Sequence, residues 1–183
     1  MQFLRSASKS VLVVPFLLLL TATASATTLV HRSLDRLTSD NETIVEATVL
    51  DIHSYWNPEH TFIFTDVHAR LSQVLKGLPG DELSFTVMGG SVGPTTTLIV
   101  GGPDLAPGLD YVLFLARTDL PGAPDRLTIR DLCQGVFDVQ DGRAFSQARG
   151  ELLLPDAMGH TEVPGGDEGI ALDRLTQQIL ELR

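Results

Sequence analysis

The sequence contains little of several features that would reveal a function directly. It has one cysteine, Cys133, so no disulfide can form within the chain. Lysine and arginine total 13 against 23 aspartates and glutamates, and the formal net charge is −10. Such a chain is repelled by nucleic-acid phosphates and by anionic lipid surfaces. These deficits exclude a disulfide scaffold and argue against nucleic acid as a partner.

Long hydrophobic runs are absent after the N-terminal region. Arg5 and Lys9 precede an apolar stretch over 11–20, and Ala24-Ser25-Ala26 supplies the small residues after which signal peptidases cut. We therefore predict a signal peptide over residues 1–26, export to the periplasm or the extracellular space, and no membrane span after cleavage. Retention of this segment as an anchor is the alternative.

Most of the remaining chain is rich in β-branched residues and turn signals. The stretch YVLFLA over 111–116 is almost wholly apolar and predicts a strand buried on both faces. No helical stretch interrupts this part of the chain, which argues against βαβ units. Strands are predicted over 44–53, 61–75, 82–88, 94–100, 111–116, 127–129, 135–139 and 143–146.

Helices are predicted only at the two ends of the exported chain. Ser33 to Leu37 has the pattern of a short capped helix. Ile170, Leu175, Ile179 and Leu182 stand at helical spacing, with Leu172 on the same apolar side, and predict an amphipathic C-terminal helix. We predict a mainly β domain over 27–149, built as an OB-like five-stranded barrel or a small β-sandwich. An irregular segment rich in Pro, Gly and acidic residues follows over 150–169, and the helix over 170–183 packs on the barrel.

A possible nucleophile occurs in the stretch MGGSVGPTT. Gly89 to Gly93 fits the G-x-S-x-G pattern of a serine hydrolase, with Ser91 as the nucleophile. That motif requires a helix directly after the serine, whereas Pro94 and the threonines at 95–97 favour a strand. We therefore predict a glycine-rich strand connection and keep a secreted serine hydrolase as the alternative function.

Histidines and the cysteine are the remaining candidates for chemistry. His53 and His60 flank the loop of a predicted hairpin and could bind a metal together with a nearby acid such as Glu59. Isolated surface histidines explain the same pattern, and no metal or other cofactor is predicted. Cys133 is expected to be a buried unreactive thiol, with a reactive or intermolecularly bridged thiol as the alternative.

An aromatic group marks the same loop. Tyr55 and Trp56 precede Asn57-Pro58, and loops at the end of a barrel often bind ligands. We predict that Tyr55 and Trp56 contact an unknown protein or envelope component. A role of Trp56 in covering the end of the barrel is the alternative. The predicted function is thus that of an exported, non-enzymatic binding domain.

Short motifs follow one another along residues 44–139. They are Ile44-Val45 with Val49, Trp56, Thr65, Val74-Leu75-Lys76-Gly77, Gly89-Gly90, Gly101 with Pro103, Pro107-Gly108, Tyr111 to Leu115, and Gln134-Gly135-Val136-Phe137 with Val139. Taken in this order, they resemble a family of uncharacterised exported bacterial proteins, some of which carry this region beside a matrixin-type metalloprotease domain. The strand order also resembles the OB-type barrel of netrin-like modules, including tissue inhibitors of metalloproteinases. Those inhibitors place the amino group of an N-terminal cysteine on the protease zinc, and this chain has no such cysteine, so no functional residue is carried over.

Overall fold

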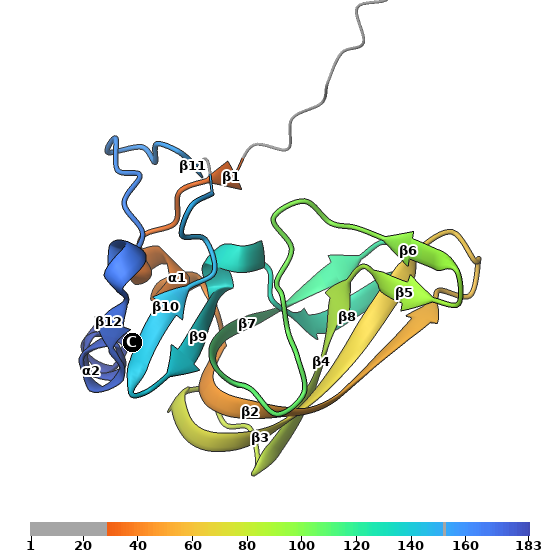
Figure 1. Cartoon of the computed structure of the whole chain (residues 1–183), viewed down its shortest axis with the longest axis horizontal. Coiled ribbons are helices and arrows are strands. Elements are labelled where there is room, and N and C mark those ends of the chain that lie inside the picture. Colours follow the sequence, from red (N-terminus) through yellow and green to blue (C-terminus); the bar gives the residue numbers. More distant parts are fainter. Residues whose placement is uncertain (1–28, 152) are drawn as a thin grey trace, which may run out of the picture.

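The computed structural model describes residues 29–151 and 153–183, so the predicted signal peptide lies outside the described residues (Figure 1). The helices are α1 (Leu34–Asp40) and α2 (Leu172–Leu182), with short 3-10 turns η1 (Leu132–Gly135) and η2 (Gly166–Glu168). The strands are β1 (Leu29–Val30), β2 (Thr43–Trp56), β3 (Ile63–Lys76), β4 (Glu82–Met88), β5 (Gly90–Val92), β6 (Thr95–Thr97), β7 (Asp110–Leu120), β8 (Ala123–Thr128), β9 (Val136–Gln140), β10 (Arg143–Ser146), β11 (Leu153–Leu154) and β12 (Ile170–Ala171).

The predicted mainly β fold with a helix near each end is confirmed. The main sheet has the order β12-β10-β9-β7-β2-β3-β4, and β8 pairs with β7 beside this path. All of its ladders are antiparallel, as expected where no helix crosses between strands. The predicted hairpin of two long strands is β2 with β3.

The predicted closed barrel is not present among the described strands. A barrel needs its last strand to pair with its first, but β4 and β12 stand at the two ends of an open sheet. β8 approaches β4 without forming a ladder with it. Leu83 of β4 and Leu127 of β8 instead pack against the same core, so side chains close this side of the sheet where a barrel would use backbone hydrogen bonds.

Three irregularities bend the β2–β3 hairpin. At each irregularity one strand has an extra residue that has no partner in the ladder. These residues are Leu50 in β2 and Ser72 and Leu75 in β3. Such bulges increase the local twist and turn a side chain toward a different face. Leu75 is fully buried in the core beneath the helices, and its carbonyl oxygen accepts a hydrogen bond from Arg183 Nη1 at 3.0 Å.

Two apolar cores lie on the two sides of β7. Successive side chains of β7 point to opposite faces of the sheet, so Leu113 packs in one core and Phe114 in the other. This confirms the strand predicted to be buried on both faces. The first core contains Val45, Ala47, Val49, Val67, Ala69, Phe85, Val87, Tyr111, Leu113, Leu115, Ile129 and Val136. The second contains Leu37, Ile44, Leu75, Val112, Phe114, Phe137, Ala144, Leu175 and Ile179.

Both helices belong to the second core. The Ser33 hydroxyl caps α1 by accepting the Arg36 backbone N–H at 3.3 Å, and Leu37 points inward. In α2 the side chains of Leu175 and Ile179 are fully buried. Two other residues of the predicted apolar side differ, because Ile170 pairs in β12 before the helix begins and Leu182 is exposed at its last residue. The predicted amphipathic helix therefore packs on the sheet with its apolar face.

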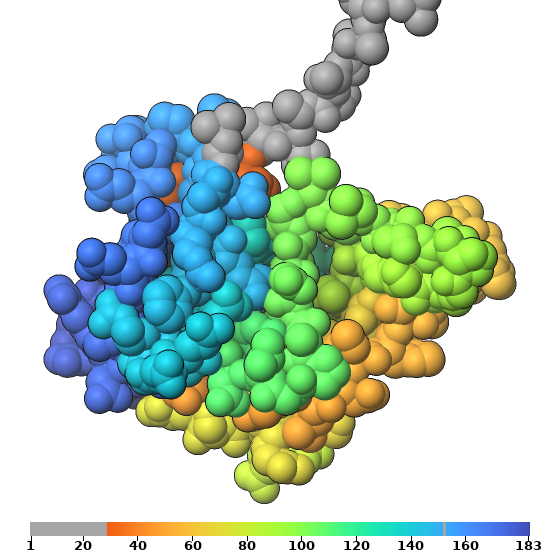
Figure 2. Space-filling model, in the orientation of Figure 1, coloured from red at the N-terminus to blue at the C-terminus, as the bar shows by residue number. Residues whose placement is uncertain are grey.

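Two small sheets complete the fold. β1 pairs in parallel with β11, which joins the start of the described chain to the segment after β10. Residues between β11 and η2 lie beside this pair, and in Figure 2 they partly cover the N-terminal strand. β5 and β6 form a short hairpin at the opposite end of the molecule, next to the end of β2 (Figure 1).

Candidate binding site

The loop between β2 and β3 is organised by one buried amide side chain. Asn57 is 3% exposed. Its Oδ1 accepts the backbone N–H groups of Thr61 and Phe62 at 2.8 and 3.0 Å. Its Nδ2 donates to the Thr61 hydroxyl at 2.9 Å and to the Glu59 carboxylate at 3.0 Å. Asparagine commonly stabilises turns through such bonds, and here it fixes the loop at four points.

The indole of Trp56 is presented by this loop. Its ring stacks on the His60 ring with centroids 6.0 Å apart and an interplanar angle of 27°. His60 has φ of +52°, an uncommon conformation for a residue with a side chain. The His60 backbone N–H donates to the Asn57 carbonyl at 2.9 Å, which helps to hold that conformation. The Trp56–His60 pair is therefore ordered before any partner arrives.

Tyr55 forms a second aromatic pair on the other face of β2. Its ring stacks on His53 at 6.2 Å, and its hydroxyl donates to the Asp66 carboxylate at 3.1 Å. Burial, and then the nearby Asp66 charge, raises the pKa of Tyr55, so the hydroxyl keeps its proton and remains a donor. We call His53, Tyr55, Trp56 and His60 the β2–β3 platform, which has a Tyr55 face and a Trp56 face.

The structure corrects one detail of the predicted contact. Adjacent residues of a strand point to opposite faces, so Tyr55 and Trp56 form two separate surfaces and cannot form a single aromatic patch. His53 goes with Tyr55 and His60 goes with Trp56. Within residues 29–151 and 153–183, no group of three His, Cys, Asp or Glu side chains is close enough to hold a metal ion.

A polar groove of about 330 Å³ adjoins the Tyr55 face. Asp66 in this groove accepts hydrogen bonds from Tyr55 and, at 2.6 Å, from the Thr86 hydroxyl. Both charge signs are represented, which suits a polar ligand better than an apolar one. The charged and imidazole side chains that line it are Asp51, His53, Asp66, His68, Arg117, Asp125 and Arg126.

Ser91 lies in β5, and a strand follows it where a nucleophile elbow needs a helix. The Ser91 hydroxyl is exposed and shares a hydrogen bond of 2.7 Å with the Thr96 hydroxyl of β6. The preference of the threonines for β structure is confirmed by β6. Gly90 has φ of +127°, and a Cβ there would collide with the hydroxyls of Ser54 and Thr65. Gly90 thus permits the close approach of the β5–β6 hairpin to the β2–β3 hairpin.

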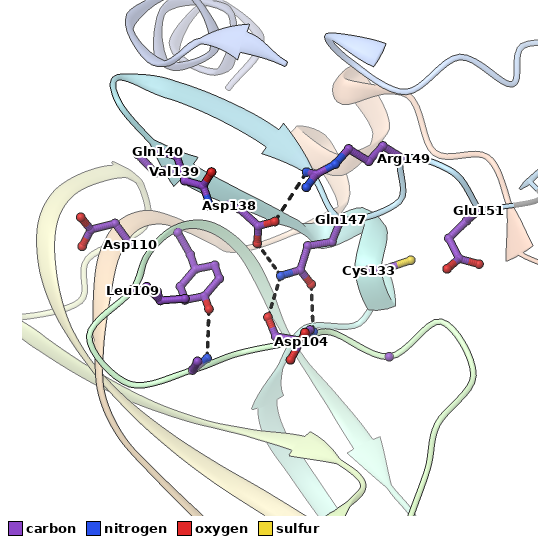
Figure 3. A pocket seen from close by; sticks show the side chains of 13 residues that line it. Asp104, Leu109, Asp110, Cys133, Asp138, Val139, Gln140, Gln147, Arg149 and Glu151 are labelled. Atoms are coloured by element: carbon purple, nitrogen blue, oxygen red, sulfur yellow. Dashed lines mark hydrogen bonds and ion pairs between the residues drawn. The ribbon is translucent and has the colours of Figure 1, made fainter. Parts of the chain in front are cut away.

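Cys133 lines a second cavity of about 430 Å³ on another side of the molecule (Figure 3). Gln147, Asp138 and Arg149 form a connected polar network there. The Gln147 amide donates to the Asp138 carboxylate and to the Asp104 carbonyl, both at 2.6 Å, and accepts the Asp104 backbone N–H at 2.9 Å. Arg149 lies 3.5 Å from the other Asp138 oxygen. These groups hold the loop before β7 against β9 and β10, which is a structural role.

The thiol in this cavity is protonated at neutral pH. Burial, reinforced by the Glu151 charge, raises the pKa of Cys133 to about 11. The thiolate is the reactive form of cysteine, so this side chain behaves as the buried unreactive thiol that the sequence predicts. The Gln147–Asp138–Arg149 network was not foreseen, because these residues follow no motif in the sequence.

Compared with models of known protein families and with curated proteins, the chain matches none. The resemblance to exported bacterial proteins with an OB-like barrel therefore stays a prediction. Within the described residues, no helix is long and apolar enough to cross a membrane.

Proposed function

We propose that this chain is an exported, non-enzymatic domain that binds another protein or a component of the cell envelope through the β2–β3 platform. The observation that carries the proposal is the Asn57-centred loop, which holds Trp56 against His60 in one geometry. A contact surface that is ordered in advance loses less conformational entropy on binding. Export and the OB-like likeness belong to the proposal, and they rest on the sequence alone.

Residue types on the platform favour recognition of another molecule. Tryptophan and tyrosine dominate the binding energy of many interfaces, because they offer a large surface with few rotatable bonds. The polar groove beside Tyr55 adds hydrogen-bonding groups of both charge signs. The net charge of −10 disfavours nucleic acid as the partner and leaves a protein or a neutral or cationic envelope component.

Site-specific photo-crosslinking can identify the partner. A photoreactive amino acid at Pro58, an exposed residue at the tip of the loop, would be introduced into the full chain in its own host. The captured molecule would then be purified and its Kd measured against the wild type, Trp56→Ala and Leu78→Ala. Leu78 is a fully exposed apolar residue on a different turn, so its variant is the matched control.

We expect Trp56→Ala to weaken binding by roughly tenfold or more, as for a central interface tryptophan. Leu78→Ala should bind as the wild type does. Urea unfolding of both variants separates a binding defect from a folding defect. Equal affinity of Trp56→Ala and the wild type for the captured molecule would place the contact elsewhere.

A further inference from the structure

His31 is a buried histidine that follows β1 and has an incompletely satisfied ring. It is 4% exposed. Its Nε2 lies 2.9 Å from the Glu162 carbonyl oxygen, which can only accept, so Nε2 carries a proton. Its Nδ1 is buried and has no hydrogen-bond partner. In the neutral ring this nitrogen carries a lone pair that accepts no hydrogen bond.

The group that faces this lone pair is a carboxylate. Asp156 Oδ2 lies 3.9 Å from His31 Nδ1. The backbone N–H of His160, as the largest cause, lowers the pKa of Asp156, so the carboxyl group is charged at neutral pH. A buried lone pair beside a negative oxygen is unfavourable. A proton on His31 Nδ1 converts the same geometry into an attractive ion pair.

The same carboxylate also serves a second imidazole. Asp156 Oδ1 accepts the backbone N–H groups of Met158 and His160 at 2.8 and 2.9 Å, which fixes the orientation of the carboxylate. The remaining oxygen, Oδ2, lies 3.3 Å from His160 Nδ1. Two histidines thus lie close to one carboxylate oxygen, and protonation of either ring makes its contact with that oxygen an ion pair.

One side of this arrangement is anchored more firmly than the other. The buried Gln134 side chain donates to the Val30 carbonyl at 3.0 Å and accepts the Arg32 backbone N–H at 2.7 Å, so it holds the backbone on both sides of His31. The His31 backbone N–H also donates to the Leu154 carbonyl at 2.8 Å. The segment 155–163 that His31 contacts is mostly exposed.

We propose that His31, Asp156 and His160 form a proton-operated latch that fastens the segment 155–163 over a cavity beside the start of α1. The cavity measures about 600 Å³, and His31, Ser33, His160 and Glu162 are among its lining residues. In Figure 2 the segment lies beside the N-terminal strand, as the latch requires. Protonation tightens the segment, and loss of the proton loosens it.

The charged groups around the latch are few. Asp156 faces His31 directly, and His160 lies on the same Asp156 oxygen. Glu162, in the wall of the cavity, accepts the His31 Nε2–H with its backbone carbonyl. Arg32, next to His31 in the chain, is engaged with Asp40 at 3.5 Å and with Asp131 at 3.6 Å. No cation among these described contacts competes with the imidazoles for Asp156.

The direction of the pH dependence follows from these contacts. The ion pairs exist only while the imidazoles carry a proton, so the latch loosens on the alkaline side. Because the pKa of Asp156 is lowered from 3.8, its contribution is present above 3.8 and is lost as pH falls through the lowered value. The latch is therefore tightest in mildly acidic solution.

Amide hydrogen exchange of the purified full chain tests the latch. Protection of the amides in 156–163, corrected for the intrinsic effect of pH, should be severalfold higher at about pH 5.5 than at about pH 8. His31→Gln keeps a donor for the Glu162 carbonyl but cannot titrate in this range, so it should remove the pH dependence. His68→Gln, in an exposed pair with Glu82 on another sheet region, is the matched control and should keep it.

A second measurement needs no substitution. In an NMR titration of the wild type, the ring signals of His31 and the amide signals of Met158 and His160 should change together with one midpoint. Protection that is independent of pH in the wild type, or pH dependence that persists in His31→Gln, would overturn the latch. So would protection at about pH 8 that requires added Zn²⁺ and is lost with a chelator, because a metal ion would then be the cation at this oxygen.

Discussion

Asn57 and Thr61 bond to each other twice. Asn57 Oδ1 accepts the Thr61 backbone N–H at 2.8 Å, and Asn57 Nδ2 donates to the Thr61 hydroxyl at 2.9 Å. This reciprocal pair closes the β2–β3 loop from within, so the position of Trp56 depends on a neighbouring side chain that is itself buried.

Removing this amide should loosen the platform. We expect Asn57→Ala to lower the free energy of unfolding by about 1–3 kcal/mol, because buried backbone N–H groups lose their acceptor. Trp56 is the only tryptophan, so a lower fluorescence anisotropy would report its greater freedom without any label. Pro58→Ala, at an exposed position of the same loop, should change neither quantity. Equal urea midpoints for Asn57→Ala and the wild type would contradict the role of Asn57.

Cys133 should react slowly in the folded protein. With its pKa raised to about 11, the thiolate fraction at about pH 8 is roughly a thousandth, and burial blocks the reagent as well. We expect disulfide-exchange reagents to label the thiol in urea far faster than in buffer. The native rate should rise as pH increases toward the raised pKa, over the range in which the fold persists. A native rate close to the rate in urea would show a reactive thiol.

Two leucines of α2, one buried within the helix and one exposed at its last residue, should differ sharply in their sensitivity to truncation. Leu175→Ala is expected to destabilise the fold by about 2–5 kcal/mol, the usual effect of deleting a fully buried leucine side chain. Leu182→Ala, on the same helix but 39% exposed, should have an effect of about 0.5 kcal/mol or less. Urea unfolding measures both. Similar values for the two variants would mean that α2 does not pack on the sheet in solution.

A fluorophosphonate probe distinguishes the proposed binding function from a serine hydrolase. Ser91 is bonded to Thr96 and precedes a strand, so no labelling of the folded wild type is expected. Labelling that disappears in Ser91→Ala would establish Ser91 as a nucleophile and would contradict the non-enzymatic proposal.

Elemental analysis of the purified chain tests the alternative of a metal at His53 and His60. These histidines stack on different aromatic rings, Tyr55 and Trp56, which point to opposite faces of β2. We expect no stoichiometric zinc or copper. Metal that is present in the wild type and lost in both His53→Ala and His60→Ala would reverse this assignment.

The sequence was most informative where the pattern of side chains decides the structure. The apolar run at 111–116 indicates a strand buried on both faces, because nothing in it prefers water, and β7 divides the two cores as expected. The threonines at 95–97 likewise indicate a strand after Ser91. Both predictions depend on intrinsic preferences that the surrounding fold does not oppose.

Other features arise from contacts between distant segments and leave no local signal. A simple period of two cannot locate the bulge at Leu75, which is produced by the register of β3 against β2. The sheet would close into a barrel if β8 paired with β4. The described strands form no such ladder, so the predicted barrel is wrong. The pairing of His31 with Asp156 joins a strand end to a segment without periodicity, so sequence alone could not bring them together.

The ladder between β2 and β7 has a consequence for how the chain reaches its structure. Most strand pairs of the main sheet are neighbours in sequence, namely β2 with β3, β3 with β4, β7 with β8, and β9 with β10. Val45 and Leu113, by contrast, meet across a long stretch of chain. Local hairpins form on the microsecond timescale, whereas distant pairings are slow because a large loop must close first. We therefore expect the docking of β7 onto β2 to limit the folding rate, with the platform loop forming earlier as part of the β2–β3 hairpin.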